Sequence, residues 1–199
     1  MKNIIKSTAL LLCSLAFLTA CDDDRDNNPT IQTPTTFVLN TPSYAQANVD
    51  LATSESLAFS WSQPDYGFPA LASYQIQVSP TNRWTKDIQA GEKDATDQAV
   101  GDYKTFDTEF SLVKGSVAAN EMAKALQEIV RYEPNNVPAS QDVYVRVRAA
   151  YAGDTIYSNA VQIKVLPYYM KLKAAAIDVW YLIRGCIRDG AWTNDKGAR

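Results

Sequence analysis

The 199-residue sequence predicts a mainly β fold, a β-sandwich of short strands with one inserted helix. Three observations lead to this prediction. Several segments between residues 57 and 165 alternate large apolar with polar side chains, which is the period of a β-strand. Turn-forming residues separate these segments. One segment, residues 117–131, instead places its apolar side chains at helical spacing.

The expected strands follow one another from the start of the domain. Residues 36–39 open the series, and residues 57–62 alternate until a proline-containing turn at residues 63–67 ends the strand. Residues 74–78 place three large apolar side chains on one face and two glutamines on the other. A further strand is expected within residues 102–112, where the bulk comes from Tyr103, Phe106 and Phe110.

The last two strands form a hairpin. Residues 142–149 send Val143, Val145, Val147 and Ala149 to one face and Tyr144, Arg146 and Arg148 to the other. A turn at Gly153 and Asp154 precedes the returning strand, residues 158–165.

The helix predicted at residues 117–131 is amphipathic. Its apolar residues lie at helical spacing, and its charged residues fall outside that stripe: Ala123, Leu126, Ile129 and Val130 against Glu121, Lys124 and Glu128. We expect it to cover one open end of the sandwich, a structural role.

Composition and charge exclude several classes of function. The net charge of −3 offers no basic field for a nucleic acid. The sequence has no histidine, which excludes Ser-His-Asp and Cys-His triads and the histidine-containing zinc motifs. No phosphate-binding loop or metal-ligand cluster is present, so no cofactor or metal is expected.

The N-terminus has the form of an export signal. Residues 1–6 carry two positive charges, and the apolar run at residues 9–18 is too short to span a bilayer. The run closes with Leu18-Thr19-Ala20-Cys21, which resembles the lipobox of bacterial lipoproteins. The resemblance implies a signal peptide at residues 1–20 and lipidation of Cys21. The alternative is an ordinary signal peptide followed by a chance cysteine.

Residues 21–36 are polar, rich in proline and acidic at their start, which is typical of a flexible tether. The aspartates that follow Cys21 resemble the surface-export signal of lipoproteins in glycan-degrading Gram-negative bacteria. They are also compatible with retention at the inner membrane or with a plain solvated spacer. Removal of the signal peptide would discard Cys13 and leave Cys186 as the other cysteine, so no intrachain disulfide is expected.

The domain at residues 37–168 resembles fibronectin type III and related immunoglobulin-like modules. Trp61 resembles their strand-B core tryptophan and Tyr74 their strand-C tyrosine, and the run VRVRA…SNAVQIKV resembles their final hairpin. Val143 stands at the inward position where many such modules place a tyrosine, while Tyr144 faces outward. A tyrosine corner is therefore not expected.

The order of parts resembles the SusE/SusF-type outer-membrane starch-binding lipoproteins. After a linker at residues 169–177, the run WYLIRGCIRDGAWTN carries the family's glycine–tryptophan pattern at Gly185, Gly190 and Trp192. Residues 178–199 are too few for a β-sandwich module, so we expect the truncated start of a carbohydrate-binding module. The alternative is that this segment packs on the first domain as an extra strand or a helix. The resemblance implies a non-catalytic protein, lipid-anchored in the outer membrane and facing outward. It also implies starch or maltooligosaccharide as the ligand, bound through downstream modules, and a neighbouring transporter complex as partner.

Four tryptophans are candidates for sugar stacking. Trp192, on an expected loop, is the best placed to stack on a sugar ring, although it could equally be a core residue of its module. Trp61 and Trp180 are interpreted as core residues and Trp84 as a solitary aromatic on a loop or edge. With no cluster of exposed aromatics expected in residues 37–168, we predict weak or no starch binding by this chain. The alternative function is a structural or adhesive lipoprotein without glycan affinity. A glycosidase would need a carboxylate pair in a cleft, for which the scattered acids give no support.

Overall fold

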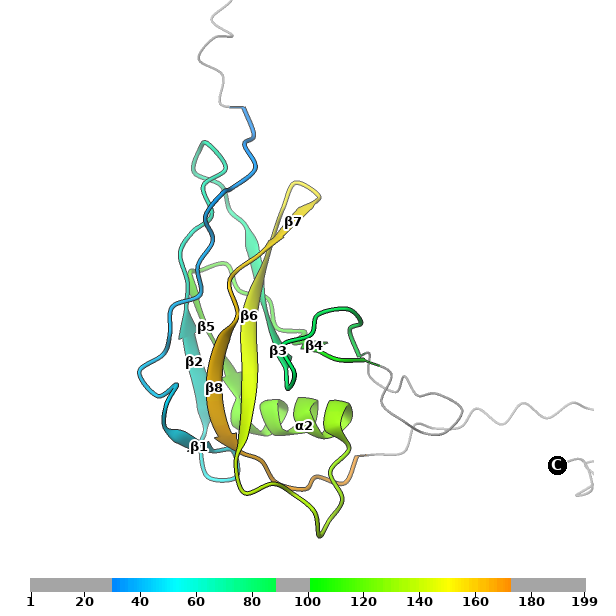
Figure 1. The fold of residues 1–199 in the computed structure, drawn as a ribbon. Coiled ribbons are helices and arrows are strands. Elements are labelled where there is room, and N and C mark those ends of the chain that lie inside the picture. The colour runs from blue at the N-terminus through cyan, green and yellow to red at the C-terminus, as the bar shows by residue number, and fades with distance from the viewer. Residues whose placement is uncertain (1–29, 89–100, 173–199) are drawn as a thin grey trace, which may run out of the picture.

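The structure is a computed structural model that describes residues 30–88 and 101–172 as a two-layer β-sandwich (Figure 1). One layer is a six-stranded sheet, the other a two-stranded sheet, and one helix follows the smaller sheet. The predicted fold class, mainly β with one inserted helix, is confirmed. The elements are β1 (Asn48–Asp50), β2 (Ser56–Ser60), β3 (Ser73–Ser79), β4 (Lys104–Thr105), β5 (Lys114–Ala118), α2 (Ala119–Val130), β6 (Gln141–Tyr151), β7 (Asp154–Tyr157) and β8 (Val161–Leu166).

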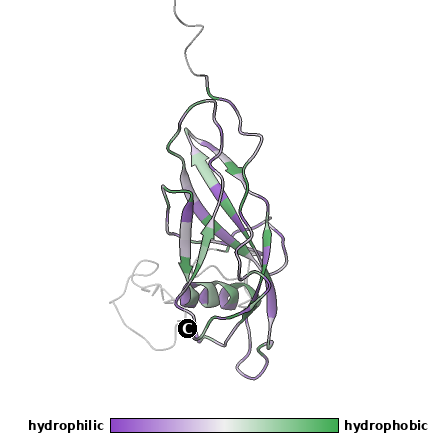
Figure 2. Cartoon of the chain, turned by 90° about the vertical axis from the view of Figure 1, so that its left-hand side faces the viewer, coloured by the Kyte–Doolittle hydropathy of each residue, from purple (hydrophilic) through white to green (hydrophobic). Residues whose placement is uncertain are grey.

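The larger sheet has the order β1-β8-β6-β3-β4, with β7 also paired to β6. Its centre is the antiparallel β3–β6 pair, in which Ile76 lies opposite Val147. Apolar and polar residues alternate along the strands, as Figure 2 shows by colour. Val143 and Val147 are fully buried, whereas Tyr144 and Arg146 lie on the other face and are partly exposed. The predicted facing of this strand is therefore confirmed.

The smaller sheet pairs β2 with β5 in antiparallel register, with Leu57 opposite Val117. The strand predicted at residues 36–39 is reduced to a single bridge between Leu39 and Trp61, extended by the N–H of Ser62, which donates to the carbonyl of Val38. This segment still joins the small sheet, although it forms no continuous ladder.

The core between the two sheets is built around aromatic rings. Trp61 is 3% exposed, and its ring centroid lies 5.4 Å from that of Tyr74 and 6.0 Å from that of Phe110. Phe37 lies 6.2 Å from Tyr74 on the same measure. Aromatic rings at these separations contribute both burial and favourable edge-to-face contacts. The interpretation of Trp61 as a core residue is confirmed.

The strand expected within residues 102–112 is mostly absent, because only Lys104 and Thr105 of β4 pair continuously with β3. Phe110 rejoins β3 through a separate bridge to Tyr74. The chain then crosses to the other sheet and begins β5. Gly115 of β5 allows this crossing, since a Cβ there would lie 2.7 Å from the Phe110 ring.

Helix α2 begins at Ala119, two residues later than predicted, because Val117 and Ala118 complete β5. Its buried side includes Met122 and Leu126, both fully enclosed. It ends at Arg131, which adopts the left-handed conformation that commonly terminates helices. The helix lies across the end of the sandwich opposite the β6–β7 turn, as expected from its amphipathic pattern (Figure 1).

The predicted C-terminal hairpin is present, with its second strand divided in two. The turn at Ala152 and Gly153 has positive φ at both positions, and β7 and β8 then pair in succession with β6. Arg148 pairs with Tyr157 but Val145 pairs with Val161, so two residues of β6 oppose three. Such a bulge breaks the ladder locally and redirects side chains.

The bulge places Asn159 against the N-terminal segment. Its Oδ1 accepts the N–H of Leu39 at 2.9 Å, and its Nδ2 donates to the carbonyl of Leu39 at 3.2 Å. One amide side chain thus satisfies both backbone groups of a residue that has no full strand partner.

Both ends of the described domain are held by strand β8 and helix α2. Strand β1, near the N-terminus, runs parallel to β8, with Val49 opposite Val165. After β8 the chain passes the helix, where the N–H of Met170 donates to Oε1 of the buried Gln127 at 3.3 Å.

Candidate functional site

The two site residues predicted from the sequence, Cys21 for lipidation and Trp192 for carbohydrate binding, lie outside the described residues. Both remain predictions. Within the described ranges, side chains with binding potential gather instead on the outward face of the larger sheet. We call Trp84, Tyr103, Arg146 and Tyr157 the arginine–aromatic cluster.

Arg146 is the centre of this cluster. Its Cζ lies 4.2 Å from the ring centroid of Trp84 and 4.1 Å from that of Tyr157, with Tyr103 at 5.6 Å. A guanidinium over the face of an aromatic ring is attracted by the ring quadrupole. Burial lowers the pKa of Arg146, while the neighbouring Tyr157, Tyr103 and Asp102 act in the opposite direction. The cluster therefore holds a partly desolvated cation.

Trp84 reaches the cluster from a loop that polar contacts fix in place. Its Nε1 donates to Oδ1 of Asn82, which has a positive φ of 56°. The carboxylate of Asp102 accepts the N–H groups of Thr85 and Lys86 and the Thr85 hydroxyl. Because these bonds tie the loop to the start of β4, they place the Trp84 ring beside Tyr103, at a centroid distance of 5.7 Å.

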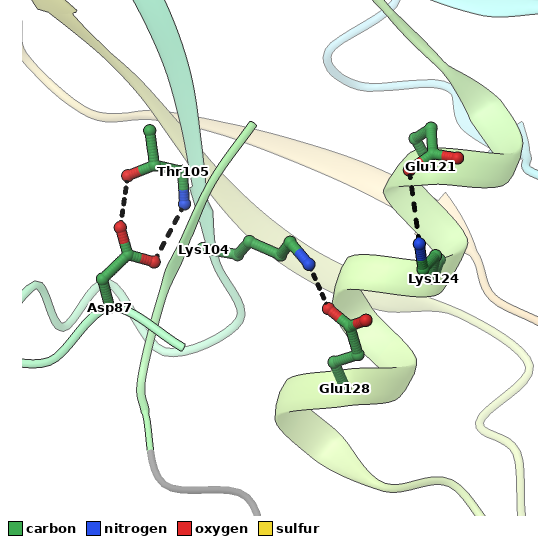
Figure 3. A network of polar contacts seen from close by, with 6 residues as sticks. All are labelled: Asp87, Lys104, Thr105, Glu121, Lys124 and Glu128. Carbon is green, nitrogen blue, oxygen red and sulfur yellow. Dashed lines mark hydrogen bonds and ion pairs between the residues drawn. The ribbon is translucent and has the colours of Figure 1, made fainter. Parts of the chain in front are cut away.

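A row of polar side chains across the sheet orients Arg146. Its Nε donates to Oε1 of Gln77 at 2.7 Å, and Nε2 of Gln77 donates to the hydroxyl of Thr105 at 2.7 Å. Asp87 accepts both the hydroxyl and the N–H of Thr105, at 2.5 Å and 3.1 Å (Figure 3). Gln77 is 2% exposed although it faces outward, since Arg146 and Thr105 both contact it.

Arg148 repeats this arrangement two residues further along β6. Its NH1 group donates to Oε1 of Gln75 at 2.6 Å, and its NH2 group lies 3.5 Å from the hydroxyl of Thr155. The two glutamines that the sequence placed on the outward face of β3 thus each hold one arginine of β6. The result is a face with two fixed positive charges.

Tyr103 shares the electrostatic environment of Arg146. Burial raises the pKa of its hydroxyl, and the charge of Asp87 raises it further. The hydroxyl of Tyr103 is therefore un-ionised at neutral pH, and Tyr103 lies beside the Arg146 guanidinium as a neutral aromatic ring.

A comparison with protein families matches residues 23–148 to the model of the family described as SusE outer membrane protein. The match covers more than half of the chain. The chain belongs to the SusE family. The match confirms the resemblance identified in the sequence and supports an outer-membrane protein of a starch-utilisation system.

Other features of this SusE-family chain offer less to a polar ligand. Within residues 30–88 and 101–172, no three acidic or cysteine side chains gather to hold a metal ion. In the same ranges, no helix has the length and apolar character that crossing a membrane requires. An open hollow of about 550 Å³ lies over β2 and β5, lined largely by apolar atoms of Pro42, Phe110 and Leu112.

The arginine–aromatic cluster of this SusE-family protein was not predicted from the sequence. Trp84 was expected to be a solitary aromatic, and that expectation is wrong, because its ring lies beside Tyr103 and Arg146. The expectation that residues 37–168 hold no cluster of exposed aromatics is not contradicted, since Trp84 and Tyr103 are only partly exposed. The strand alternation did place Arg146 on the outward face. The position of the Tyr157 ring could have been predicted only from the pairing of β6 with β7, because this pairing places Tyr157 next to Arg148.

Proposed function

We propose that this SusE-family chain is a non-catalytic lipoprotein anchored through Cys21, facing outward from the outer membrane. The sandwich at residues 37–168 is a spacer between that anchor and starch-binding modules. The observation that carries the proposal is the family match over residues 23–148, which begins just after Cys21 and covers the strands up to β6.

The form of the N-terminus supports the anchor. A short apolar run ending in Leu18-Thr19-Ala20-Cys21, followed by an acidic and proline-rich segment, suits a lipidated cysteine on a flexible tether. A dual or triple acyl anchor binds a bilayer far more stably than a single chain does. The outer-membrane assignment of the family is in keeping with such an anchor.

The described fold supports the role of spacer. Its large side chains serve a continuous core, and the outward face of the larger sheet is mainly polar. The starch-binding role is assigned to the residues after the sandwich, where Trp192 would stack against a sugar ring. A transporter of the same starch-utilisation system is the proposed membrane partner.

Metabolic labelling with a fatty acid tests the anchor. We expect the unmodified chain and Cys13→Ala to incorporate the label and Cys21→Ala to incorporate none, because Cys13 lies within the signal peptide. Label that persists in Cys21→Ala would exclude Cys21 as the acceptor. Protease treatment of intact cells tests the orientation, since an outward-facing domain is degraded and an inward-facing one is protected.

A further inference from the structure

Arg146 has hydrogen-bonding capacity that the described part of the chain leaves unused. Its Nε donates to Gln77, but neither Nη group has an acceptor among the described residues. No carboxylate in those ranges forms an ion pair with it. Two acids of the same region, Asp102 and Asp87, are hydrogen-bonded to other groups: Asp102 accepts bonds from Thr85 and Lys86, and Asp87 accepts bonds from Thr105.

The surroundings of Arg146 restrict how a ligand can approach it. Trp84 and Tyr157 lie near the guanidinium at 4.2 Å and 4.1 Å, and Gln77 occupies its Nε edge. The edge of the guanidinium that carries the two Nη groups is therefore the side on which a polar group of a ligand can accept hydrogen bonds. A guanidinium edge with two parallel N–H donors matches a carboxylate better than it matches a hydroxyl.

The rest of the face favours a sugar over a protein surface. The outward neighbours of Arg146 on β3 and β6 are Gln75, Gln77, Tyr144 and Arg148, which are two amides, a phenol and a cation. Protein interfaces also use aromatic residues and arginine, but they place them around an apolar core, and the strand neighbours of Arg146 on this face are polar. The amides of Gln75 and Gln77 are already hydrogen-bonded within the sheet, so the contact surface for a sugar comes from Tyr157, which is 46% exposed and offers a ring for the C–H face of a pyranose.

We propose that the arginine–aromatic cluster binds an acidic glycan, with the carboxylate of a uronic acid on the Nη edge of Arg146 and its ring against Tyr157. Arg148 lies on the same face, two residues along β6, and attracts the carboxylate of a neighbouring sugar. This site goes beyond the proposed function, because it lies in the domain treated there as a spacer and selects a charged sugar instead of starch.

Isothermal titration of residues 22–199 with tri-galacturonate tests this site, with maltotriose as the neutral comparison. We expect tri-galacturonate to bind at least about tenfold more tightly than maltotriose, since a bidentate charge-assisted pair is available to it alone. We also expect this preference to weaken in about 0.5 M NaCl, because salt screens exposed charges.

Substitutions locate the binding. Arg146→Gln is expected to weaken tri-galacturonate binding by about tenfold or more, and Arg146→Lys to restore little of it, because lysine lacks the planar fork. Tyr157→Ala is expected to weaken binding while Tyr157→Phe retains it. Lys164→Gln, on β8 of the same sheet, is the matched control and should leave binding unchanged. If Arg146→Gln fails to fold by circular dichroism, the Tyr157 pair gives the answer alone, since that ring is exposed.

Four results would overturn the proposal: no measurable binding of tri-galacturonate, equal affinity for maltotriose, unchanged affinity in the cluster variants, or tighter binding of a penta-glutamate peptide. The last result would identify the cluster as a site for an acidic protein segment. None of these measurements depends on lipidation of Cys21 or on Trp192, so failure here is distinguishable from failure of the proposed function.

Discussion

The indole of Trp61 connects the two layers of the sandwich at a single point. It extends from the end of β2 and contacts Tyr74 of β3 and Phe110 of the crossing segment. Its Nε1 is buried without a hydrogen-bond partner among the described residues. The stabilisation it provides thus comes from apolar burial and ring contacts, which offset the cost of one unsatisfied donor.

We predict that Trp61→Ala destabilises the chain by about 3–5 kcal/mol, because the substitution removes buried area and leaves a cavity. Denaturant unfolding of residues 22–199 followed by circular dichroism measures this loss. Trp84→Ala, which removes a partly exposed ring, is the comparison and should cost much less. A loss below about 1 kcal/mol for Trp61→Ala would place it among surface substitutions and contradict its core role.

Asp102 is the residue whose charge the fold stabilises most clearly. Burial alone would raise the pKa of its carboxyl, but hydrogen bonds from the Thr85 hydroxyl and from the N–H groups of Lys86 and Thr85 outweigh burial and lower the pKa. A folded-state pKa below the unfolded value of about 3.9 means that the ionised group stabilises the fold. This contribution is present above the unfolded pKa and is lost as the pH falls through the folded pKa.

We therefore predict that Asp102→Asn lowers the free energy of unfolding at about pH 7, and that this deficit shrinks as the pH falls below about 4. Urea unfolding at a series of pH values measures the difference. Asp107→Asn, which removes an exposed charge from the same segment, controls for net charge. A deficit for Asp102→Asn that stays constant down to about pH 2 would contradict the linkage.

At the scale of elements, one ion pair connects the helix to the larger sheet. Lys104 of β4 and Glu128 of α2 form an ion pair whose side chains are 14% and 13% exposed (Figure 3). On the helix itself, Glu121 and Lys124 lie 4.0 Å apart and are about half exposed. The Lys104–Glu128 pair is largely buried. Removing one partner therefore costs free energy, because the remaining charge is left buried without its partner and without full hydration.

We predict that Glu128→Gln destabilises the chain by about 1.5–3 kcal/mol, the range for hydrogen bonds to charged groups. Glu121→Gln, on the same helix, is expected to cost less than about 0.5 kcal/mol, as exposed pairs do. Thermal or urea unfolding of the two variants measures both values. Equal effects of the two substitutions would show that the Lys104–Glu128 ion pair does not stabilise the packing of α2 against the larger sheet.

The elements that the sequence predicted well are those whose own residues alternate. Strands β2, β3 and β6 follow the expected phase because each buries one face against the core. The helix start was placed too early because Val117 is apolar and fits both the last position of a strand and the first turn of a helix. In residues 102–112 the rings suggested one strand, although only Lys104 and Thr105 form β4 and Phe110 pairs with β3 through a separate bridge before the chain crosses between sheets.

The arginine–aromatic cluster could not be predicted in the same way, because its four members come from four separate segments. Trp84 lies on a loop, Tyr103 before β4, Arg146 in the middle of β6 and Tyr157 at the end of β7. Local periodicity gives the face of each strand residue but not which strands are neighbours. Sheet order and register, which decide these contacts, arise from long-range packing.

At the scale of the whole molecule, the described domain offers neutral glycans little to hold. Of the three rings in the arginine–aromatic cluster only Tyr157 is exposed, and the hollow over β2 and β5 is largely apolar. A polysaccharide platform needs several aromatic and polar side chains held in place together. Starch binding would therefore rest on residues outside the sandwich.

We predict that residues 22–199 bind a long maltooligosaccharide with millimolar or weaker affinity. One stacking ring at Trp192 contributes about 1 kcal/mol by analogy with aromatic pairs, whereas ordering a segment costs roughly 1–2 kcal/mol per residue. Titration calorimetry, with affinity electrophoresis in amylopectin gels, measures this. Micromolar binding that Trp192→Ala abolishes and Trp84→Ala leaves unchanged would show a complete sugar site around Trp192.

The parallel pairing of β1 with β8 has a mechanical consequence. A chain held at its N-terminus and pulled at its other end feels tension along both strands, and parallel strands so loaded are drawn in opposite directions along their axes. Their hydrogen bonds are then sheared together and cannot open one at a time. The two hydrogen bonds between the Leu39 backbone and the Asn159 side chain attach the N-terminal segment at a second point. A domain anchored at one end and loaded at the other would thereby resist unfolding under tension.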